Sequence, residues 1–517
     1  MYDCLIRGGL IADGTGAPLF RGDVALRDGK IAGIGDFFHD RAEKIIDAGG
    51  LVVAPGFFDA HAHSDTGFLS DTSCASKLYQ GITTEVTGQC GSSPFPTGAD
   101  ASDPWQCPSF QDFLDKFRRE GPGMATHQAM LCGHGDLRAA VMGYQDRPAT
   151  DAEIEGMRAL LARDLAAGAW GLSLGLEYAP GVFADRRELA ALAAVVRQFD
   201  GVVTCHMRSE GLQIEAAIDE LAEAGRQSGA HVHISHLKID HFSRHGQAEK
   251  IWEKIEDIRR GGVQLTCDLY PYTASCTSLS IRCPAWSREG GSQALVKRLQ
   301  GEERQQIVEG IRAHYFNARR AETCLINSDG GLWPQIVGKT LRQVAEEELH
   351  TRDYADAAAQ VLIRTQGKAG CIFFVMDEGD MLHFLSKNIG IGSDGWALSG
   401  DEKKVDGKPH PRSYGAVAEF FRLNRMHRFC STEMAVRRVT GLAADMLGMQ
   451  DRGYIRKGYA ADITVFDPDT IAPRATYLNP VQLAEGVEYV LIGGKAALEK
   501  GRQTALRNGE FLRKRRA

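Results

Sequence analysis

Both ends of the chain alternate short apolar runs with turn residues. Over the first 55 residues the runs are CLIRGGLIADGTG, DVALRDGKIAGIG and KIIDAGGLVVAPG, and the same texture returns near the end in YIRKGYAADITVFDP and VEYVLIGGKAALEKG. Asp-Gly pairs between strand-like runs are a strong hairpin signal. The pattern predicts that residues 1–55 and 426–517 fold together as one β domain, with everything between them inserted as another.

The middle of the chain, residues 56–425, shows short apolar runs that are each followed by a helical stretch. Examples are TTEVTG, GAWGLSLGL, GVVTCHMRSE, HVHISHLK, VQLTCDLYPY and IGIGSDG. Strands that alternate with helices over this length predict a parallel α/β barrel, in which chemistry lies at the C-terminal ends of the strands. A charged, helix-like stretch interrupts the pattern, and it predicts an insertion around residues 285–369 that covers the barrel mouth.

Composition narrows the classes of protein and of partner. The 517 residues are 43% hydrophobic and 25% charged, as in globular proteins, with a formal net charge of -7 and no basic stripe, so nucleic acid is excluded as a partner. No apolar run has the ~20 residues that a membrane span needs. The chain has twelve cysteines at irregular spacings and no CxxC pair, and its first residues (MYDCLIRGGL) do not have the pattern of a signal peptide. Both observations indicate reduced thiols and a cytoplasmic location.

A pair of histidines provides the first candidate chemistry. His61 and His63 follow the apolar run VVAPGFFDA. On a strand, residues i and i+2 face the same side, so both imidazoles project together, as binding of one metal ion requires. The pair alone is equally compatible with packed or solvated histidines.

Four further residues stand where the barrel model requires reactive groups, each at the end of a different apolar run: Cys90, His206, His236 and Asp394. A lone cysteine or histidine is more often structural, but the four together form a coherent set. A thiolate and neutral imidazoles bind Zn²⁺ with one position left for water, whose pKa then falls towards ~7. Asp394 is the carboxylate that takes the proton of this water and passes it to the leaving amine.

Taken together, the motifs of the chain resemble the amidohydrolase superfamily and, within it, the D-aminoacylase (N-acyl-D-amino-acid deacylase) family. The superfamily motifs are GFFDAHAHSD, the terminal SDG and KGYAADITVFDP. The motifs of the branch are GQCGSSPFP, GLSLGLEYAPG, HMRSE, ISHLK, DLYPYTA and HPRSYG. The resemblance covers nearly the whole chain. It implies a metal-bearing TIM-like (β/α)8 barrel with a small β-sandwich built from both termini.

The same resemblance implies roles for the candidate ligands. Cys90, His206 and His236 would be the tight zinc ligands, while His61 and His63 would form a second, weaker metal position that shares Cys90. Superfamily members often use a carboxylated lysine at the end of the fourth strand as a bridging ligand. The corresponding run, GAWGLSLGLEYAPG, has no lysine, which agrees with a bridging Cys90. Glu177 in this run either touches a metal or caps the loop, and the cap is the favoured reading.

An N-acyl amino acid carries a carboxylate, so its pocket needs fixed cations or hydrogen-bond donors. Lys238 resembles the family's carboxylate-binding lysine, and Tyr272 resembles a substrate-contacting tyrosine. Arg412 is a further candidate, and Arg208 and His134 are weaker ones. At Arg282 the sequence differs from that of relatives that are selective for substrates with neutral side chains. This arginine either selects a D-glutamate or D-aspartate derivative or points into solvent.

The sequence thus predicts zinc-dependent hydrolysis of the amide bond of an N-acyl-D-amino acid, and the D preference depends on the resemblance alone. Two alternatives stay open. One is a cyclic-amide or dipeptide hydrolase of the same superfamily, against which the missing lysine and Cys90 argue. The other is a barrel that has lost catalysis and serves as a binding or assembly protein. The acyl group, the side chain, the number of metals and the oligomeric state are not determined by the sequence.

Overall fold

The computed structural model describes residues 1–97 and 103–515 of the chain. Strands from both ends of the chain pair in one nine-stranded sheet, in the order β21-β20-β19-β18-β5-β1-β2-β3 with β4 on β1. These strands are β1 (Tyr2–Ile11), β2 (Phe20–Arg27), β3 (Lys30–Gly35), β4 (Ala42–Asp47), β5 (Val52–Pro55), β18 (Ile463–Phe466), β19 (Val487–Ile492), β20 (Lys495–Glu499) and β21 (Arg502–Gln503). The antiparallel pairing of β5 with β18 joins the two ends of the chain, as the repeated strand-and-turn pattern predicts.

The parallel strands form two sheets, ordered β17-β13-β12-β11-β10-β9 and β22-β8-β7-β6, and all of them come from the middle of the chain except β22, which lies near its C-terminus. They are β6 (Phe57–Asp59), β7 (Ile82–Thr87), β8 (His127–Met130), β9 (Cys132–Gly133), β10 (Gly171–Gly175), β11 (Val202–His206), β12 (His231–Ile234), β13 (Leu265–Leu269), β17 (Gly390–Ile391) and β22 (Phe511–Leu512). Most are buried along their whole length because helices cover them, which explains their continuous apolar character. The predicted α/β class with parallel strands is confirmed.

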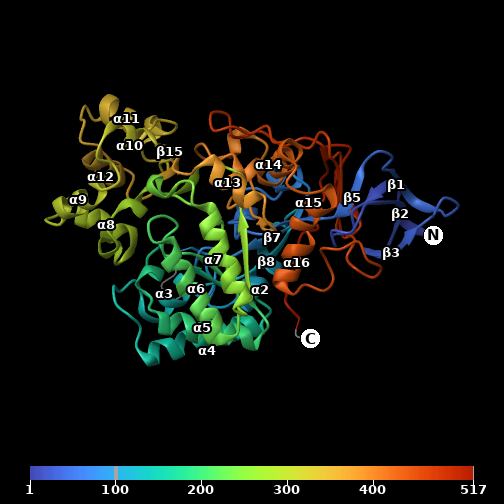
Figure 1. Ribbon diagram of the computed structural model, residues 1–517, viewed down its shortest axis with the longest axis horizontal. Helices are drawn as coiled ribbons and strands as arrows, with labels where there is room; N and C mark the ends of the chain where they lie inside the picture. Colours follow the sequence, from blue (N-terminus) through green and yellow to red (C-terminus); the bar gives the residue numbers. More distant parts are fainter. Residues whose placement is uncertain (98–102, 516–517) are drawn as a thin grey trace.

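Helices follow the strands and pack around them (Figure 1). They are α1 (Ala75–Leu78), α2 (Phe110–Glu120), α3 (His134–Met142), α4 (Asp151–Ala166), α5 (Arg186–Gln198), α6 (Ile214–Ser228), α7 (Ala248–Arg260), α13 (Glu378–Leu385), α14 (Arg412–His427), α15 (Thr432–Arg438) and α16 (Gly441–Leu447). The expected domain boundary at 425/426 falls inside α14, which continues to His427. Single turns are η1 (Gly67–Leu69), η2 (Gly181–Phe183), η3 (Phe242–Arg244) and η8 (Glu402–Lys404).

The segment that interrupts the strand-helix pattern forms a separate lobe, at the left of Figure 1. A three-stranded antiparallel sheet, β14-β16-β15, carries its helices and has its own hydrophobic core. The elements are β14 (Ser275–Ser278), β15 (Cys324–Ser328), β16 (Gly370–Phe373), α8 (Gly291–Gln300), α9 (Arg304–Arg312), α10 (Ala318–Glu322), α11 (Leu341–Gln343) and α12 (Tyr354–Arg364), with the short turns η4 (Leu279–Arg282), η5 (Ala285–Arg288), η6 (Pro334–Ile336) and η7 (Val344–Glu348). This insertion lobe, residues 275–373, is slightly longer than the expected 285–369 because β14 at its start pairs with β16 at its end.

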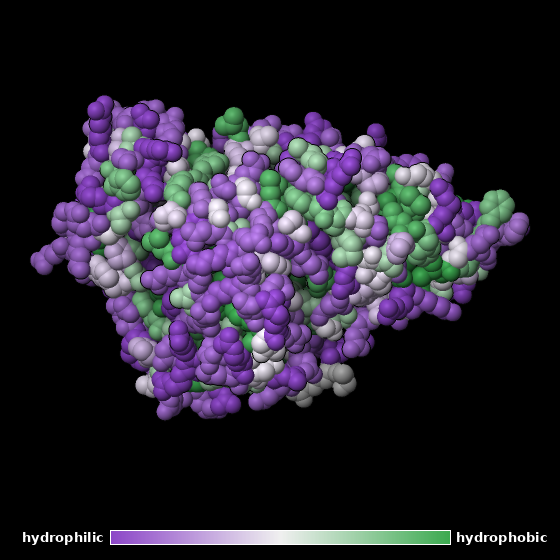
Figure 2. Space-filling model, viewed as in Figure 1, coloured by the Kyte–Doolittle hydropathy of each residue, from purple (hydrophilic) through white to green (hydrophobic). Residues whose placement is uncertain are grey.

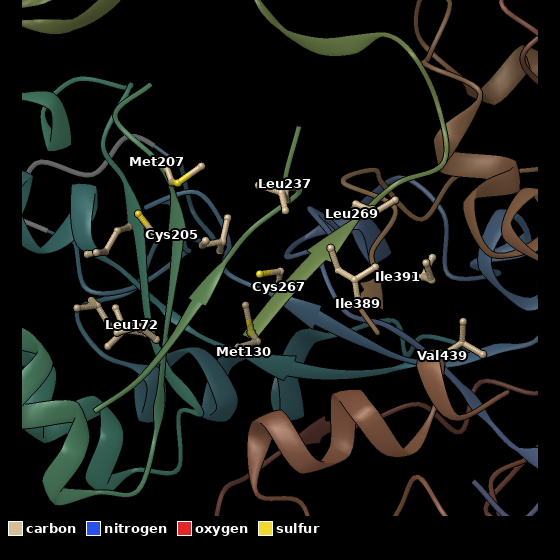
Figure 3. Close-up of a cluster of buried hydrophobic side chains, with 14 of the residues drawn as sticks. Met130, Leu172, Cys205, Met207, Leu237, Cys267, Leu269, Ile389, Ile391 and Val439 are labelled. Atoms are coloured by element: carbon tan, nitrogen blue, oxygen red, sulfur yellow. The ribbon is translucent and has the colours of Figure 1, made fainter. Parts of the chain in front are cut away.

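Buried apolar side chains fill the space between the parallel strands and their helices. Figure 3 shows part of this core, with Leu172, Cys205, Leu237, Cys267 and Ile391 among the labelled residues. The visible surface in Figure 2 is mostly hydrophilic, with apolar residues gathered over the region of β1 and β5. Among the described residues, no helix has the length and apolar character that crossing a bilayer demands.

Candidate metal centre and substrate cavities

Polar side chains gather at the C-terminal ends of the parallel strands. His61 and His63 follow β6, Cys90 follows β7, His206 ends β11, His236 follows β12 and Asp394 follows β17. The structure brings these six predicted residues together at one edge of the sheets.

The thiol of Cys90 lies at the centre of three imidazoles. Its Sγ is 3.4 Å from Nε2 of His61, 3.4 Å from Nε2 of His236 and 3.7 Å from Nδ1 of His206. The Nδ1 of His206 and the Nε2 of His236 are themselves 3.1 Å apart. Sulfur and nitrogen donors that converge in a buried place are the ligands that Zn²⁺ prefers. The residues present therefore fit the predicted metal.

Asp394 lies beside this group. Its Oδ1 is 3.0 Å from Nε2 of His63 and 3.7 Å from Nε2 of His61, and its Oδ2 is 2.8 Å from the Arg412 guanidinium. Burial opposes ionisation of Asp394, but Arg412 and the neighbouring imidazoles hold the pKa of this carboxyl well below its usual range. Asp394 is therefore an ionised proton acceptor at neutral pH.

Two carboxylates hold the outer nitrogens of the central imidazoles. Glu210 lies 2.9 Å from Nδ1 of His236, and Glu177 lies 2.9 Å from Nε2 of His206. Such contacts fix the tautomer and the orientation of a metal-binding imidazole. Glu177 is thus neither a loop cap, as favoured from the sequence, nor among the residues around Cys90. Glu210 was missed, although it is the last residue of HMRSE and stands four residues after His206.

Asp268 at the end of β13 ties the histidines of neighbouring strands together. It accepts hydrogen bonds from the backbone N–H of His236 at 2.7 Å and from Nε2 of His233 at 2.7 Å. His61 Nδ1 lies 3.8 Å from the same carboxylate. The structure therefore places His236, rather than His233, beside Cys90.

The backbone of the site is strained. Cys90 (φ 54°), His236 (φ 37°) and Asp394 (φ 51°) all lie in the left-handed region, which residues with a Cβ seldom adopt. Strain of this kind is concentrated at functional sites, where the surrounding structure imposes it. Gly175 at the end of β10 adds a close approach, because a Cβ there would come within 1.9 Å of the Cys90 carbonyl oxygen. The fourth strand thus ends in a glycine against which the Cys90 loop packs, where a lysine would not fit.

A buried lysine positions the strand ends beneath the metal residues. Lys77 Nζ lies 2.6 Å from Asp59 Oδ2 and donates to Ser393 Oγ at 2.9 Å and to the Gly395 carbonyl at 3.3 Å. Asp59 also accepts from the Ser393 backbone N–H at 2.7 Å. Burial opposes the charge on Lys77, but Asp59 and Glu85 raise its pKa above the ordinary value. This cluster connects β6, which precedes His61, to the turn that carries Asp394.

Two cavities open beside the metal residues and share Tyr178, Cys276, Thr277 and Asp394 in their walls. The large cavity, of about 390 Å³, reaches from Cys90 and Arg412 to the insertion lobe. The small cavity contains Lys238 and Arg282. Lys238 is buried there with its Nζ 2.5 Å from Glu210. Arg282 lies 4.5 Å over the Phe373 ring, and its guanidinium has no ion-pair partner among the described residues.

Tyr272 is not among the described residues that line either cavity. Pro271 turns the chain after β13, so the Tyr272 hydroxyl points at Gly415, where an added Cβ would lie 2.8 Å from it. Among the described residues Tyr270 lines neither of the two cavities either, but its ring lies close to Lys238 and Arg412. Lys238 Nζ lies 5.7 Å from the Tyr270 ring and the Arg412 guanidinium 4.7 Å from it, and the buried Tyr270 hydroxyl has no hydrogen-bond partner in the described chain.

The weaker candidates Arg208 and His134 have structural partners. Arg208 pairs with Glu220 at 2.9 Å and donates to the carbonyls of Val182 and Ala184. His134 lies 2.6 Å from Glu188 in a fully buried pair. Both side chains are therefore engaged in holding loops of the fold.

Comparisons with known proteins agree with this geometry. A family model described as amidohydrolase family matches residues 44–292 and 394–497. The chain is 34% identical to an N-acyl-D-aspartate deacylase of Alcaligenes xylosoxydans xylosoxydans, over 99% of this chain and 95% of that protein. It is 33% identical to an N-acyl-D-glutamate deacylase of the same organism, over 99% and 96%. A crystal structure of N-acyl-D-glutamate deacylase from Bordetella bronchiseptica, complexed with zinc and a phosphonate inhibitor, superposes with a TM-score of 0.84 and 32% identity, covering 99% of each chain.

Proposed function

Because the chain belongs to the amidohydrolase family, we propose that it is a zinc-dependent enzyme that hydrolyses N-acyl-D-amino acids to a carboxylate and a free D-amino acid. The observation that carries this proposal is the convergence of three imidazoles on the Cys90 thiol, with Asp394 alongside. The relatives named N-acyl-D-aspartate and N-acyl-D-glutamate deacylase align with nearly the whole chain and over nearly their own whole length. We infer the substrate class from these relatives.

We propose that Cys90, His206 and His236 hold the tight metal position, and that His61 and His63 hold a second, weaker one that shares Cys90. When bound, zinc supplies Lewis-acid activation of water and of the amide carbonyl. Burial lowers the pKa of His236 to about 3, so this imidazole is neutral and free to act as a ligand at neutral pH. The carboxylates of Glu210 and Glu177 keep the correct ring nitrogens facing Cys90.

Asp394 is the proposed general base and acid. As an ionised carboxylate it takes a proton from the attacking water. It then gives this proton to the amide nitrogen as the C–N bond breaks, which makes the amine a leaving group. Arg412 keeps the carboxylate charged and oriented from its Oδ2 side, so that Oδ1 faces His63 and the metal residues.

The substrate α-carboxylate is proposed to bind between Lys238, Tyr270 and Arg412. Two cations flank a phenol whose hydroxyl has no partner among the described residues, so the three offer charge and a free donor. Arg282 faces the small cavity as a cation without a carboxylate partner in the described chain. We propose that it binds an acidic substrate side chain, which makes D-glutamate and D-aspartate derivatives the preferred substrates.

The finer architecture is also a proposal. Eight strands would close as a barrel, namely β6, β7, β8 continued by β9, β10, β11, β12, β13 and β17. The closure is supported by the hydrogen bond from Ala60 N–H to the Ile391 carbonyl at 3.2 Å and by the parallel bridge between Ala62 and Gly395. Residues 1–55 and 426–517 would form the second domain, of which 516–517 lie outside the described residues.

A substrate panel tests the reaction class. The zinc-loaded protein is offered N-acetyl-D-glutamate, a dipeptide with D-glutamate at its C-terminus, and a six-membered cyclic amide, and free amine is measured. We expect release from N-acetyl-D-glutamate far above the other two. Faster opening of the cyclic amide would assign the chain to the cyclic-amide hydrolases, and inertness towards all three with bound zinc would contradict the proposal.

A further inference from the structure

We propose that the large cavity receives the acyl half of the substrate and is built for a dicarboxylic acyl group, such as succinyl or glutaryl, whose free carboxylate binds Lys368. This inference rests on the proposed deacylase function and names the acyl group that the active site prefers. Hydrolysis adds water across the amide. The C–N bond breaks, the amine takes a proton, and the products are a dicarboxylate and a free D-amino acid.

The arrangement of the two cavities separates the halves of the substrate. Both cavities border Asp394, where the scissile amide must lie if this carboxylate moves the proton. The small cavity, of about 20 Å³, is lined by Lys238 and Arg282 together with the carboxylates of Glu177, Glu210 and Asp240. Lys238 is already paired with Glu210, so Arg282 is the cation that can match a carboxylate of an acidic amino acid. The acyl group leaves the amide carbon on the opposite side from the amino acid. It therefore extends into the large cavity.

The large cavity is much larger than an acetyl group requires. Its volume is about 390 Å³, whereas one water occupies ~30 Å³ in the liquid and a methyl group has a similar size. An acetyl methyl would leave most of this space to solvent. The walls near Asp394 carry Tyr178, Pro180 and Trp396, which offer apolar surface to a chain of methylene groups.

The far end of the large cavity is polar, with hydrogen-bond donors on Lys368 and Ser328 and an amide on Asn327. Asn327 and Ser328 at the end of β15, and Lys368 just before β16, line it from the insertion lobe. The Lys368 ammonium and the Ser328 hydroxyl have no hydrogen-bond or ion-pair partner among the described residues. Asn327 is 8% exposed, and its Oδ1 is buried without a partner in the described chain. The polar groups at this end are thus unsatisfied by the protein.

The chemistry of these groups selects the ligand. A lysine ammonium has three donors and no acceptor, and an ionised carboxylate is acceptor-only. A carboxylate at the end of the acyl chain would satisfy Lys368 and Ser328 together. Asp136 is the other carboxylate that lines the large cavity besides Asp394, within the described chain. Burial raises its pKa to about 7, which reduces its negative charge near neutral pH.

The test compares acyl groups on one amino acid. The kcat/KM of the zinc-loaded enzyme is measured for the N-acetyl, N-butyryl, N-succinyl and N-glutaryl derivatives of D-glutamate, with N-butyryl as the uncharged control for chain length. We expect the N-succinyl or the N-glutaryl derivative to exceed both uncharged ones by roughly 10-fold or more, since hydrogen bonds to charged groups are the stronger ones. Lys368→Gln should remove this advantage and lower kcat/KM for the N-succinyl and N-glutaryl derivatives to the level of N-butyryl.

Lys297→Gln is the matched control, because Lys297 is an equally exposed lysine of the insertion lobe that lies outside both cavities. Normal turnover of N-acetyl-D-glutamate without any gain from the second carboxylate would overturn the inference and leave the proposed function intact. A succinyl preference that survives Lys368→Gln would overturn the role of Lys368. No turnover of any derivative by zinc-loaded protein would overturn the proposed function itself.

Discussion

The carboxylate of Glu210 lies 2.9 Å from Nδ1 of His236, on the opposite edge of the imidazole from the Nε2 that faces Cys90. In the Nδ1–H tautomer His236 donates a hydrogen bond to Glu210, and its Nε2 lone pair is directed at the metal residues. The Lys238 ammonium lies 2.9 Å from the same Nδ1 and 2.5 Å from Glu210, so the proposed metal ligand His236 and the proposed substrate-binding Lys238 share one carboxylate. Burial opposes the charge of Glu210, but Lys238 and the two imidazoles hold its pKa below the usual range.

Glu210→Gln should weaken zinc binding by about 10- to 100-fold, the usual loss when the partner of a metal-binding histidine is removed. Competition with a chelating dye measures the affinity. Glu215→Gln, which changes an ion pair with Arg244 away from the site, serves as the control. Equal zinc affinity of Glu210→Gln and the wild type would contradict an orienting role for Glu210.

Asp394→Asn should lower kcat by roughly 10²- to 10⁴-fold, because general acid-base catalysis contributes about this much. Zinc content should stay near that of the wild type, since the proposed tight ligands are unchanged. Asp401→Asn, at an exposed helix cap, is the control. If the Asp394→Asn variant kept a tenth or more of the wild-type kcat, another group would be moving the proton.

Lys77→Met should cost about 3–5 kcal/mol of unfolding free energy, because it leaves Asp59 and Glu85 as buried charges without their cation. Denaturant unfolding measures this loss. Lys116→Met removes a lysine of similar reach from a partly exposed pair with Glu120, and it should cost less than about 1 kcal/mol. Equal stability of the two variants would show that the buried cluster does not hold the strand ends together.

Asp136 should make stability depend on pH. Burial, with a contribution from Asp65, raises its pKa from 3.8 to about 7. The folded state then binds the proton more tightly than the unfolded state, so this stabilisation is complete below about pH 4 and is lost as pH rises to about 7. The slope is at most ~1.4 kcal/mol per pH unit.

Asp136→Asn should therefore lose less unfolding free energy than the wild type between pH 4 and pH 7. Asp146→Asn, on an exposed turn nearby, should follow the wild type. Asp65 also interacts with Asp136, and burial raises its pKa to about 6, so it contributes to the wild-type curve in this range. Tyr144 and Cys132 interact with Asp136 as well, but neither ionises between pH 4 and pH 7. Parallel stability curves for the Asp136→Asn variant and the wild type would contradict the raised pKa.

The strand ends were predictable from the sequence because a parallel strand is a continuous apolar run, and a polar residue directly after it marks its C-terminal end. His206 and Asp394 were found in this way. The choice of His236 over His233 also agrees with the structure, where His233 faces Asp268.

Side-chain partners were not predictable in the same way, because they depend on which loops meet in space. Glu210 follows His206 by only four residues, but its contact with His236 comes from another strand. The resemblance points to Tyr272, but Tyr270 stands in the same motif, and only the turn at Pro271 decides which phenol lies near Lys238. The interrupted pattern predicts an insertion over the barrel mouth, but it does not show which residues of the insertion line the large cavity.

Release of free amine from paired N-acetyl-D-glutamate and N-acetyl-L-glutamate, with the zinc content of the same preparation, tests the central claim most directly. We predict bound zinc, turnover of the D enantiomer at least ~100-fold above the L enantiomer in kcat/KM, and loss of activity on chelation with recovery on added zinc. Turnover of the L enantiomer alone, or undiminished turnover by protein freed of metal, would contradict the claim.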